Sequence, residues 1–182
     1  MLQEEIRRRL DEGNAQWQSL EGETAARRLD GAENGQRPYA IVVACSDSRV
    51  VPEQIFNASL GELFVIRVAG NVLDKHQLGS IEYAAGHLHS RMILVLGHTG
   101  CGAVGAAISG GGDGFIQYIT DEILRAVGRE RDPLRACEKN VAHAVELLRR
   151  EFAEHPEIPT AELDICGAVY DIASGAVRWL DI

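Results

Sequence analysis

The sequence predicts an α/β protein: a mainly parallel β-sheet flanked by helices, with an antiparallel hairpin at its carboxyl-terminal edge and a helical arm at the amino terminus. Three short runs rich in Val, Ile and Leu are typical of strands that are buried on both faces. Segments of helical character alternate with these runs, and this order produces parallel sheets. The three runs cover residues 39–44, 63–68 and 92–96.

Apolar spacing and glycines place the helices that follow. Residues 78–89 lie between the second and third runs and are predicted to be helical, and residues 103–108 fit the start of another helix. The glycine-rich residues 110–114 indicate a flexible joint. Beyond this joint, residues 115–127 carry apolar side chains at helical spacing, which predicts a helix that packs on a core or on a partner. These apolar residues are Phe115, Ile119, Ile123 and Val127.

A longer helix is predicted to begin with Asp132 as its N-cap and Pro133 in its first turn. One face of this helix is apolar, and Cys137 belongs to that face, so we expect Cys137 to pack in the core rather than to bind metal. The apolar face consists of Leu134, Cys137, Val141, Val145, Leu148 and Phe152.

The last segments of the chain have the pattern of a β-hairpin. Residues 164–172 and 176–180 flank the turn-forming pair Ser174-Gly175, which predicts a hairpin that returns to the edge of the sheet. Cys166 then lies in a strand, where packing is the expected role of its side chain.

Length and charge limit the class of protein. With 182 residues, of which 46% are hydrophobic, the chain is expected to form one domain over residues 1–182. Its 27 acidic and 18 basic residues give a net charge of −9, which argues against nucleic acid or an anionic membrane as a partner and favours a small molecule. The sequence shows no signal-peptide core and no apolar run that would span a bilayer, so we expect a cytoplasmic protein.

Three side chains with the chemistry of metal ligands follow two of the predicted strands. Cys45 comes directly after the first strand, and His98 and Cys101 come after the third. The carboxyl ends of parallel strands meet at one edge of a sheet, where ligands bind in α/β folds. Two thiolates and one imidazole suit Zn²⁺, and three protein ligands leave a fourth position open, as in catalytic zinc sites.

A carboxylate and a guanidinium accompany the first of these ligands. Asp47 and Arg49 alternate with Cys45 in residues 45–49. Away from a metal, an Asp-Arg pair is an ordinary surface contact that contributes little. Beside a metal ligand, the same pair is expected to be functional, because the arginine keeps the aspartate ionised and fixes its direction.

The chain resembles the β-carbonic anhydrases, whose metal motifs are Cys-x-Asp-x-Arg and, later in the chain, His-x-x-Cys. Residues 45–49 match the first motif and residues 98–101 match the second. The resemblance covers nearly the whole chain. Its further matches are Gly13-Asn14 with Trp17 nearby, residues 67–71, residues 97–104 and residues 167–171.

The resemblance implies a cofactor, a reaction and an assembly. Zn²⁺ would be held by Cys45, His98 and Cys101, and Asp47 with Arg49 would form the catalytic pair. The implied reaction is the reversible hydration of carbon dioxide to bicarbonate and a proton, by attack of a zinc-bound hydroxide that this pair orients. The implied assembly is a homodimer or a dimer of dimers with a β-carbonic anhydrase-like fold, in which residues 1–30 form a helical arm that packs on the partner subunit.

Other functions remain open from the sequence. The same zinc site suits the hydrolysis of carbonyl sulfide or carbon disulfide, which are also small, linear and electrophilic. A non-catalytic zinc-binding protein, or a thiol protein in which Cys45 and Cys101 form a redox pair, belongs to a different class. The absence of a Cys-x-x-Cys motif argues against the redox alternative.

Overall fold

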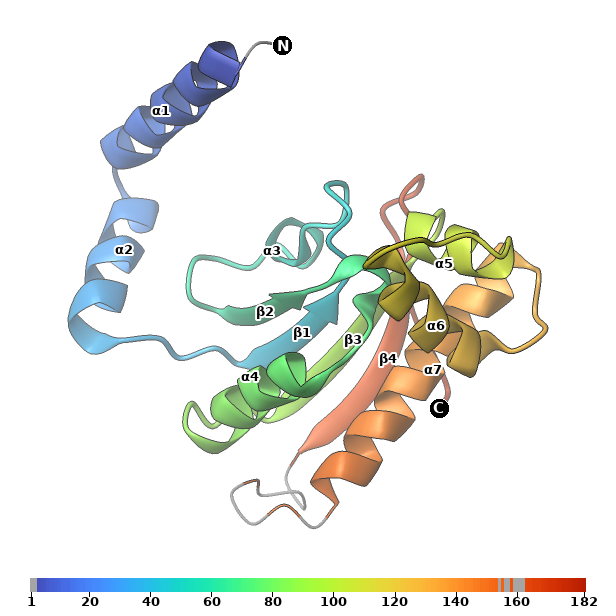
Figure 1. Cartoon of the computed structure of the whole chain (residues 1–182). Coiled ribbons are helices and arrows are strands. Elements are labelled where there is room, and N and C mark those ends of the chain that lie inside the picture. Colours follow the sequence, from blue (N-terminus) through green and yellow to red (C-terminus); the bar gives the residue numbers. More distant parts are fainter. Residues whose placement is uncertain (1–2, 154, 156–157, 159–162) are drawn as a thin grey trace.

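The computed structural model describes residues 3–153, 155, 158 and 163–182, and it confirms the predicted α/β class (Figure 1). The strands of the described residues form one sheet with the order β2-β1-β3-β4-β5. Neighbouring strands from β2 to β4 run parallel, and β5 pairs antiparallel with β4, as the predicted hairpin requires. The strands are β1 Ala40–Ala44, β2 Leu63–Arg67, β3 Met92–His98, β4 Asp164–Tyr170 and β5 Val177–Trp179.

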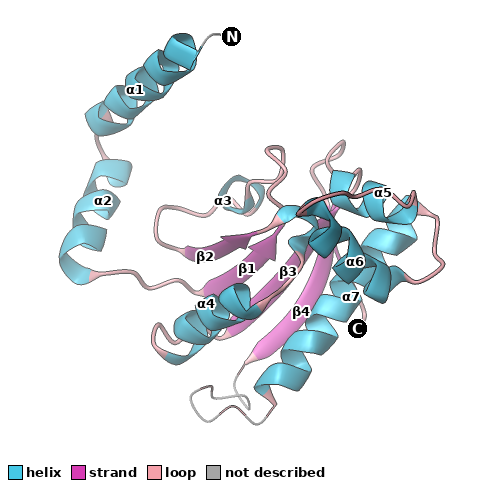
Figure 2. Ribbon diagram, viewed as in Figure 1, coloured by secondary structure: helices cyan, strands magenta, loops and turns pink. Residues whose placement is uncertain are grey.

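Helices α4 and α7 lie along one face of this sheet, and α5 and α6 lie near the carboxyl ends of the strands (Figure 2). Apolar side chains of α4 and α7 share one core cluster with alternate residues of β1 and β3. The helices are α1 Gln3–Ser19, α2 Glu23–Asn34, α3 Pro52–Ile55, α4 Lys75–Gly86, α5 Gly102–Ile108, α6 Ile116–Val127 and α7 Pro133–Phe152, and Ala69–Asn71 forms a short 3₁₀ helix, η1.

The central strands β1 and β3 are buried on both faces, whereas the edge strand β2 is not. Every residue of β1 is buried, and so is every residue of β3 after Met92. In β2 the side chains are only partly buried, and Arg67 is exposed. The prediction that all three apolar runs are fully covered was therefore wrong for β2, because this strand has a neighbour on one side only.

Two element boundaries differ from the sequence prediction for identifiable reasons. Helix α4 begins at Lys75, three residues earlier than expected, because Asp74 caps it by accepting a hydrogen bond from His76 N at 2.8 Å. Strand β3 continues through Gly97 to His98. A Cβ atom on Gly97 would lie 2.6 Å from Val141 Cγ2, so the glycine allows α7 to pack closely on the strand.

The predicted start of α7 is confirmed, and so is most of its apolar face. Asp132 accepts a hydrogen bond from Arg135 N at 2.8 Å, and Pro133 is the first helical residue. Leu134 is 43% exposed, so the buried face begins one turn later than predicted. Its buried members include Cys137, Val141, Val145, Leu148 and Phe152.

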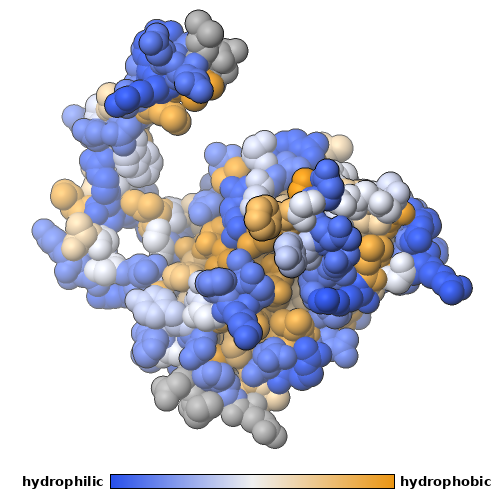
Figure 3. All heavy atoms as spheres, in the orientation of Figure 1, coloured by the Kyte–Doolittle hydropathy of each residue, from blue (hydrophilic) through white to orange (hydrophobic). Residues whose placement is uncertain are grey.

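The amino-terminal arm consists of α1 and α2 and projects away from the sheet (Figure 1). None of its helical residues is buried. One ion pair, between Arg27 Nη1 and Glu62 Oε1 at 3.0 Å, links the arm to the loop before β2. Hydrophobic atoms are visible on the arm in Figure 3, and Leu10 is 68% exposed. A search for membrane-spanning helices among the described residues finds none of sufficient length and apolarity.

Candidate metal centre

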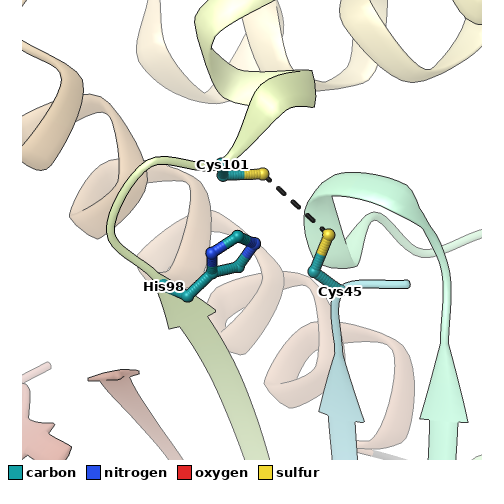
Figure 4. A group of neighbouring side chains, drawn as sticks. All are labelled: Cys45, His98 and Cys101. Atoms are coloured by element: carbon teal, nitrogen blue, oxygen red, sulfur yellow. Dashed lines mark hydrogen bonds between the residues drawn. The ribbon is translucent and has the colours of Figure 1, made fainter. Parts of the chain in front are cut away.

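The predicted ligands are brought together by the pairing of β1 with β3. Ala44 pairs with Leu96 in the parallel register, so the residues that follow both strands lie at the same end of the sheet. Cys45 follows β1, His98 is the last residue of β3, and Cys101 is the N-cap residue of α5. Figure 4 shows the three side chains pointing toward one another.

The geometry of this group fits a zinc ion. All three residues are buried, and their ligand atoms lie within 4.8 Å of one another. The sulfur atoms of Cys45 and Cys101 are 4.0 Å apart, and tetrahedral zinc with Zn–S bonds of ~2.3 Å requires about 3.8 Å. His98 Nε2 is fully buried and has no hydrogen-bond partner among the described residues. Burying a polar atom without a hydrogen-bond partner costs free energy, so the position of Nε2 favours its use as a metal ligand.

Electrostatic interactions within the group favour a thiolate at Cys45. The sulfhydryl of Cys101, His98 and the backbone N–H of Gly70 lower the pKa of Cys45 to about 4, against the effect of burial. The neighbouring Cys45 thiolate and burial raise the pKa of the Cys101 thiol. A divalent cation beside the two sulfurs would favour the thiolate form of both.

In the Asp47–Arg49 pair, hydrogen bonds from the arginine fix the orientation of the carboxylate. Arg49 Nε donates to Asp47 Oδ1 at 2.9 Å and Nη2 donates to Oδ2 at 2.7 Å, while the Arg49 backbone N–H also donates to Oδ1 at 3.0 Å. These hydrogen bonds lower the pKa of Asp47 well below its usual range. Arg49 Nη2 also approaches Gly100 O at 3.5 Å, in the loop that carries His98 and Cys101.

Arg67 lies in a matched family motif, but the sequence did not predict that this side chain fixes the loop between Cys45 and Asp47. Arg67 Nε donates to Cys45 O at 3.0 Å, and Arg67 Nη2 donates to Asp47 O at 2.6 Å. Arg67 ends β2, so the edge strand holds the backbone beside the ligand group. The parallel pairing of Ala44 with Arg67 is the structural reason for this contact, and no local pattern in the sequence reveals it.

A cavity of about 460 Å³ lies between η1, the start of α4 and α6. Val68 and Leu73 line it. Val104 packs in a core cluster with Cys45 and Cys101. The remaining lining residues are Val72, Asp74, Gln77, Tyr118, Ile119, Asp121, Glu122 and Arg125.

Comparison with known proteins agrees with the fold and shows the family. The family model described as carbonic anhydrase matches residues 40–177. Carbonic anhydrase 2 of Mycobacterium tuberculosis is 37% identical over 180 residues, covering 91% of this chain and 87% of its own. Among solved structures, the β-carbonic anhydrase CafA of Aspergillus fumigatus superposes with a TM-score of 0.79 at 26% identity, covering 97% of this chain and 91% of that chain. The Coccomyxa β-carbonic anhydrase, solved with acetazolamide, gives 0.72 at 28% identity, covering 94% and 84%.

The fold and the site define an α/β protein in which a buried group of two cysteines and a histidine, able to hold a metal ion, lies at the carboxyl ends of parallel strands. The family match over most of the chain narrows this class of protein to one family. The chain belongs to the β-carbonic anhydrase family, a family of carbonate dehydratases.

Proposed function

We propose that this protein catalyses the reversible, zinc-dependent hydration of carbon dioxide to bicarbonate and a proton. Cys45, His98 and Cys101 are the proposed zinc ligands, and Asp47 with Arg49 is the proposed catalytic pair. The observation that carries the proposal is the convergence of three buried donor atoms, with His98 Nε2 unpaired. Membership of the β-carbonic anhydrase family supports the same reaction.

Zinc bound by these residues would supply a Lewis acid that activates water at neutral pH. The protein's part is to hold the reacting water in one orientation. Asp47 Oδ2 accepts one hydrogen bond in the structure, from Arg49, so it retains a lone pair for the reacting water. Because Arg49 stays charged, it keeps the carboxylate ionised and limits its rotation.

The test of this proposal separates it from the alternatives by substrate and by metal. Stopped-flow measurement of CO₂ hydration is compared with sulfide release from carbonyl sulfide and carbon disulfide by the same preparation. We expect CO₂ hydration to be much the faster reaction and to disappear when a chelator removes the zinc. Sulfide release without CO₂ hydration would assign the site to the other substrates, and a zinc-free protein with neither activity would leave the thiol alternative.

We further propose that residues 1–182 form a single domain whose arm, residues 1–30, packs on a second copy in a homodimer or a dimer of dimers. Apolar side chains on α1 are exposed at helical spacing: Ile6, Leu10 and Trp17 are 44%, 68% and 39% exposed. A helix with no buried residue has little reason to be stable alone, and a partner would bury this face. We also propose a cytoplasmic location, because a reducing compartment suits cysteines that form no disulfide.

Deleting residues 1–30 is expected to abolish assembly. Since none of the deleted helical residues is buried, the sheet and its covering helices should keep their own core. Light scattering at low micromolar concentration measures the mass of the full chain and of the truncated chain. Leu10→Glu on the apolar face should weaken assembly, whereas Asp11→Ala on the exposed polar side should not. A full-length chain that is an active monomer would contradict the proposal.

A further inference from the structure

A buried amide on α7 is connected to Cys45 through the backbone of η1. Asn140 is 4% exposed, and its Nδ2 donates a hydrogen bond to Gly70 O at 2.8 Å. The backbone N–H of Gly70 in turn donates to Cys45 Sγ at 3.2 Å. Asn140 on α7 and Gly70 on η1 lie 70 residues apart in the sequence, and together they are linked to Cys45, the first proposed zinc ligand.

We propose that Asn140 is a positioning residue for the metal centre, which holds the Gly70 peptide so that its N–H points at Cys45 Sγ. The inference rests on the proposed zinc ligation by Cys45. Through the Gly70 N–H, Asn140 fixes the direction of the Cys45 sulfur and withdraws charge from it. Asn140 itself touches neither the metal nor the substrate.

The conformation of Gly70 explains why its peptide group needs a hydrogen bond that fixes its orientation. Gly70 has φ of +68°, in the left-handed region, where glycine is free to move to many other conformations. A Cβ atom at this position would lie 2.7 Å from Ile123 Cδ1 and 3.1 Å from Ala103 Cβ. Packing therefore demands glycine here, and glycine by itself does not fix the direction of its N–H. The hydrogen bond from Asn140 supplies that constraint.

The burial of Asn140 supports a specific role. Burying an amide costs free energy unless it is hydrogen-bonded, and an aliphatic side chain of similar size would pack here without that requirement. One turn earlier on α7, Cys137 Sγ donates to His98 O at 3.4 Å. Helix α7 thus contacts the backbone of η1, whose Gly70 N–H donates to Cys45, and the backbone of His98 itself.

An N–H···S hydrogen bond changes the ligand as well as its position. It draws electron density from the thiolate, so that two thiolates neutralise less of the zinc charge and the metal remains a stronger Lewis acid. Loss of a hydrogen bond to a metal ligand typically costs about 10–100-fold in metal affinity or activity. Asn140 therefore acts on the metal centre through Gly70.

The test is Asn140→Leu, which removes the donor at similar volume, in protein loaded with cobalt(II) or zinc. We expect the sulfur-to-cobalt charge-transfer band to move to longer wavelength and zinc release to a chelator to be about 10–100-fold faster. Val145→Ala is the matched control, because Val145 is buried on the same helix within the sheet-facing core cluster. It should lose stability while leaving the band and the release rate unchanged.

A second measurement needs no variant. In protein loaded with cadmium-113, a scalar coupling between the Gly70 amide proton and the metal is expected across the hydrogen bond to Cys45. An unmoved cobalt band together with unchanged zinc release in Asn140→Leu would overturn the role of Asn140, and so would a missing coupling in the unmodified protein. A chain that binds neither cobalt nor zinc would instead overturn the proposed function on which the inference rests.

Discussion

Replacing Cys45 by serine is expected to remove most of the bound zinc, from about one equivalent per chain, and with it the CO₂ hydration activity. A hydroxyl does not ionise near neutral pH, so Cys45→Ser leaves two protein ligands where a stable zinc site needs at least three. Elemental analysis after exposure to a chelator measures the metal content, and stopped-flow hydration measures the activity.

The other cysteines provide the controls for this substitution. Cys166 is half-buried in β4 and donates to Ile93 O at 3.6 Å, and burial raises its pKa to about 11. Cys166→Ser should therefore keep its zinc. Cys137→Ser should also keep it, at some cost in stability, because Cys137 is buried against the sheet. Full zinc retention in Cys45→Ser would remove Cys45 from the ligand set.

Arg49→Ala is expected to lower CO₂ hydration by at least about tenfold, which corresponds to ~1.4 kcal/mol of transition-state stabilisation, while zinc stays bound. Without Arg49 the pKa of Asp47 rises toward its ordinary value of about 3.9. The carboxylate then still remains ionised between pH 6 and 9. The activity loss should therefore be the same across this range, because it reflects lost orientation rather than lost charge.

Asp47→Asn is expected to lose most turnover, also with zinc retained. An amide that presents its nitrogen to the reacting water cannot accept the hydrogen bond that a carboxylate oxygen accepts. Zinc content and the pH profile of hydration are measured for both variants beside the unmodified protein. Rates equal to the unmodified protein from pH 6 to 9 in both variants would show that the pair has no catalytic role.

The parts of the fold with local causes were predictable from the sequence. Asp132 and Pro133 mark the start of α7, and the apolar runs mark β1 and β3. The capping interaction of Asp74 was missed because the apolar pattern begins only after it. The hairpin of β4 and β5 was recognised from its turn residues, although its strands are shorter than predicted, because pairing stops at Tyr170 and Val177.

The candidate site was predictable as a set of side chains but not as a network. Cys45, His98 and Cys101 follow strands, so parallel pairing alone indicates that they converge. Arg67 and Asn140 act through hydrogen bonds to backbone atoms far away in the sequence. Such contacts depend on how the helices and strands pack in three dimensions, and no spacing rule in one sequence reveals them.

Cys45 and Cys101 lie 56 residues apart, and the chain between them contains β2, α4 and β3. A metal bound to both cysteines would therefore cross-link the early and the middle parts of the chain at one end of the sheet. A metal that binds only the folded state raises the free energy of unfolding with its free concentration. Zinc supply would then govern how much of the protein persists in the cell, in addition to how much of it is active.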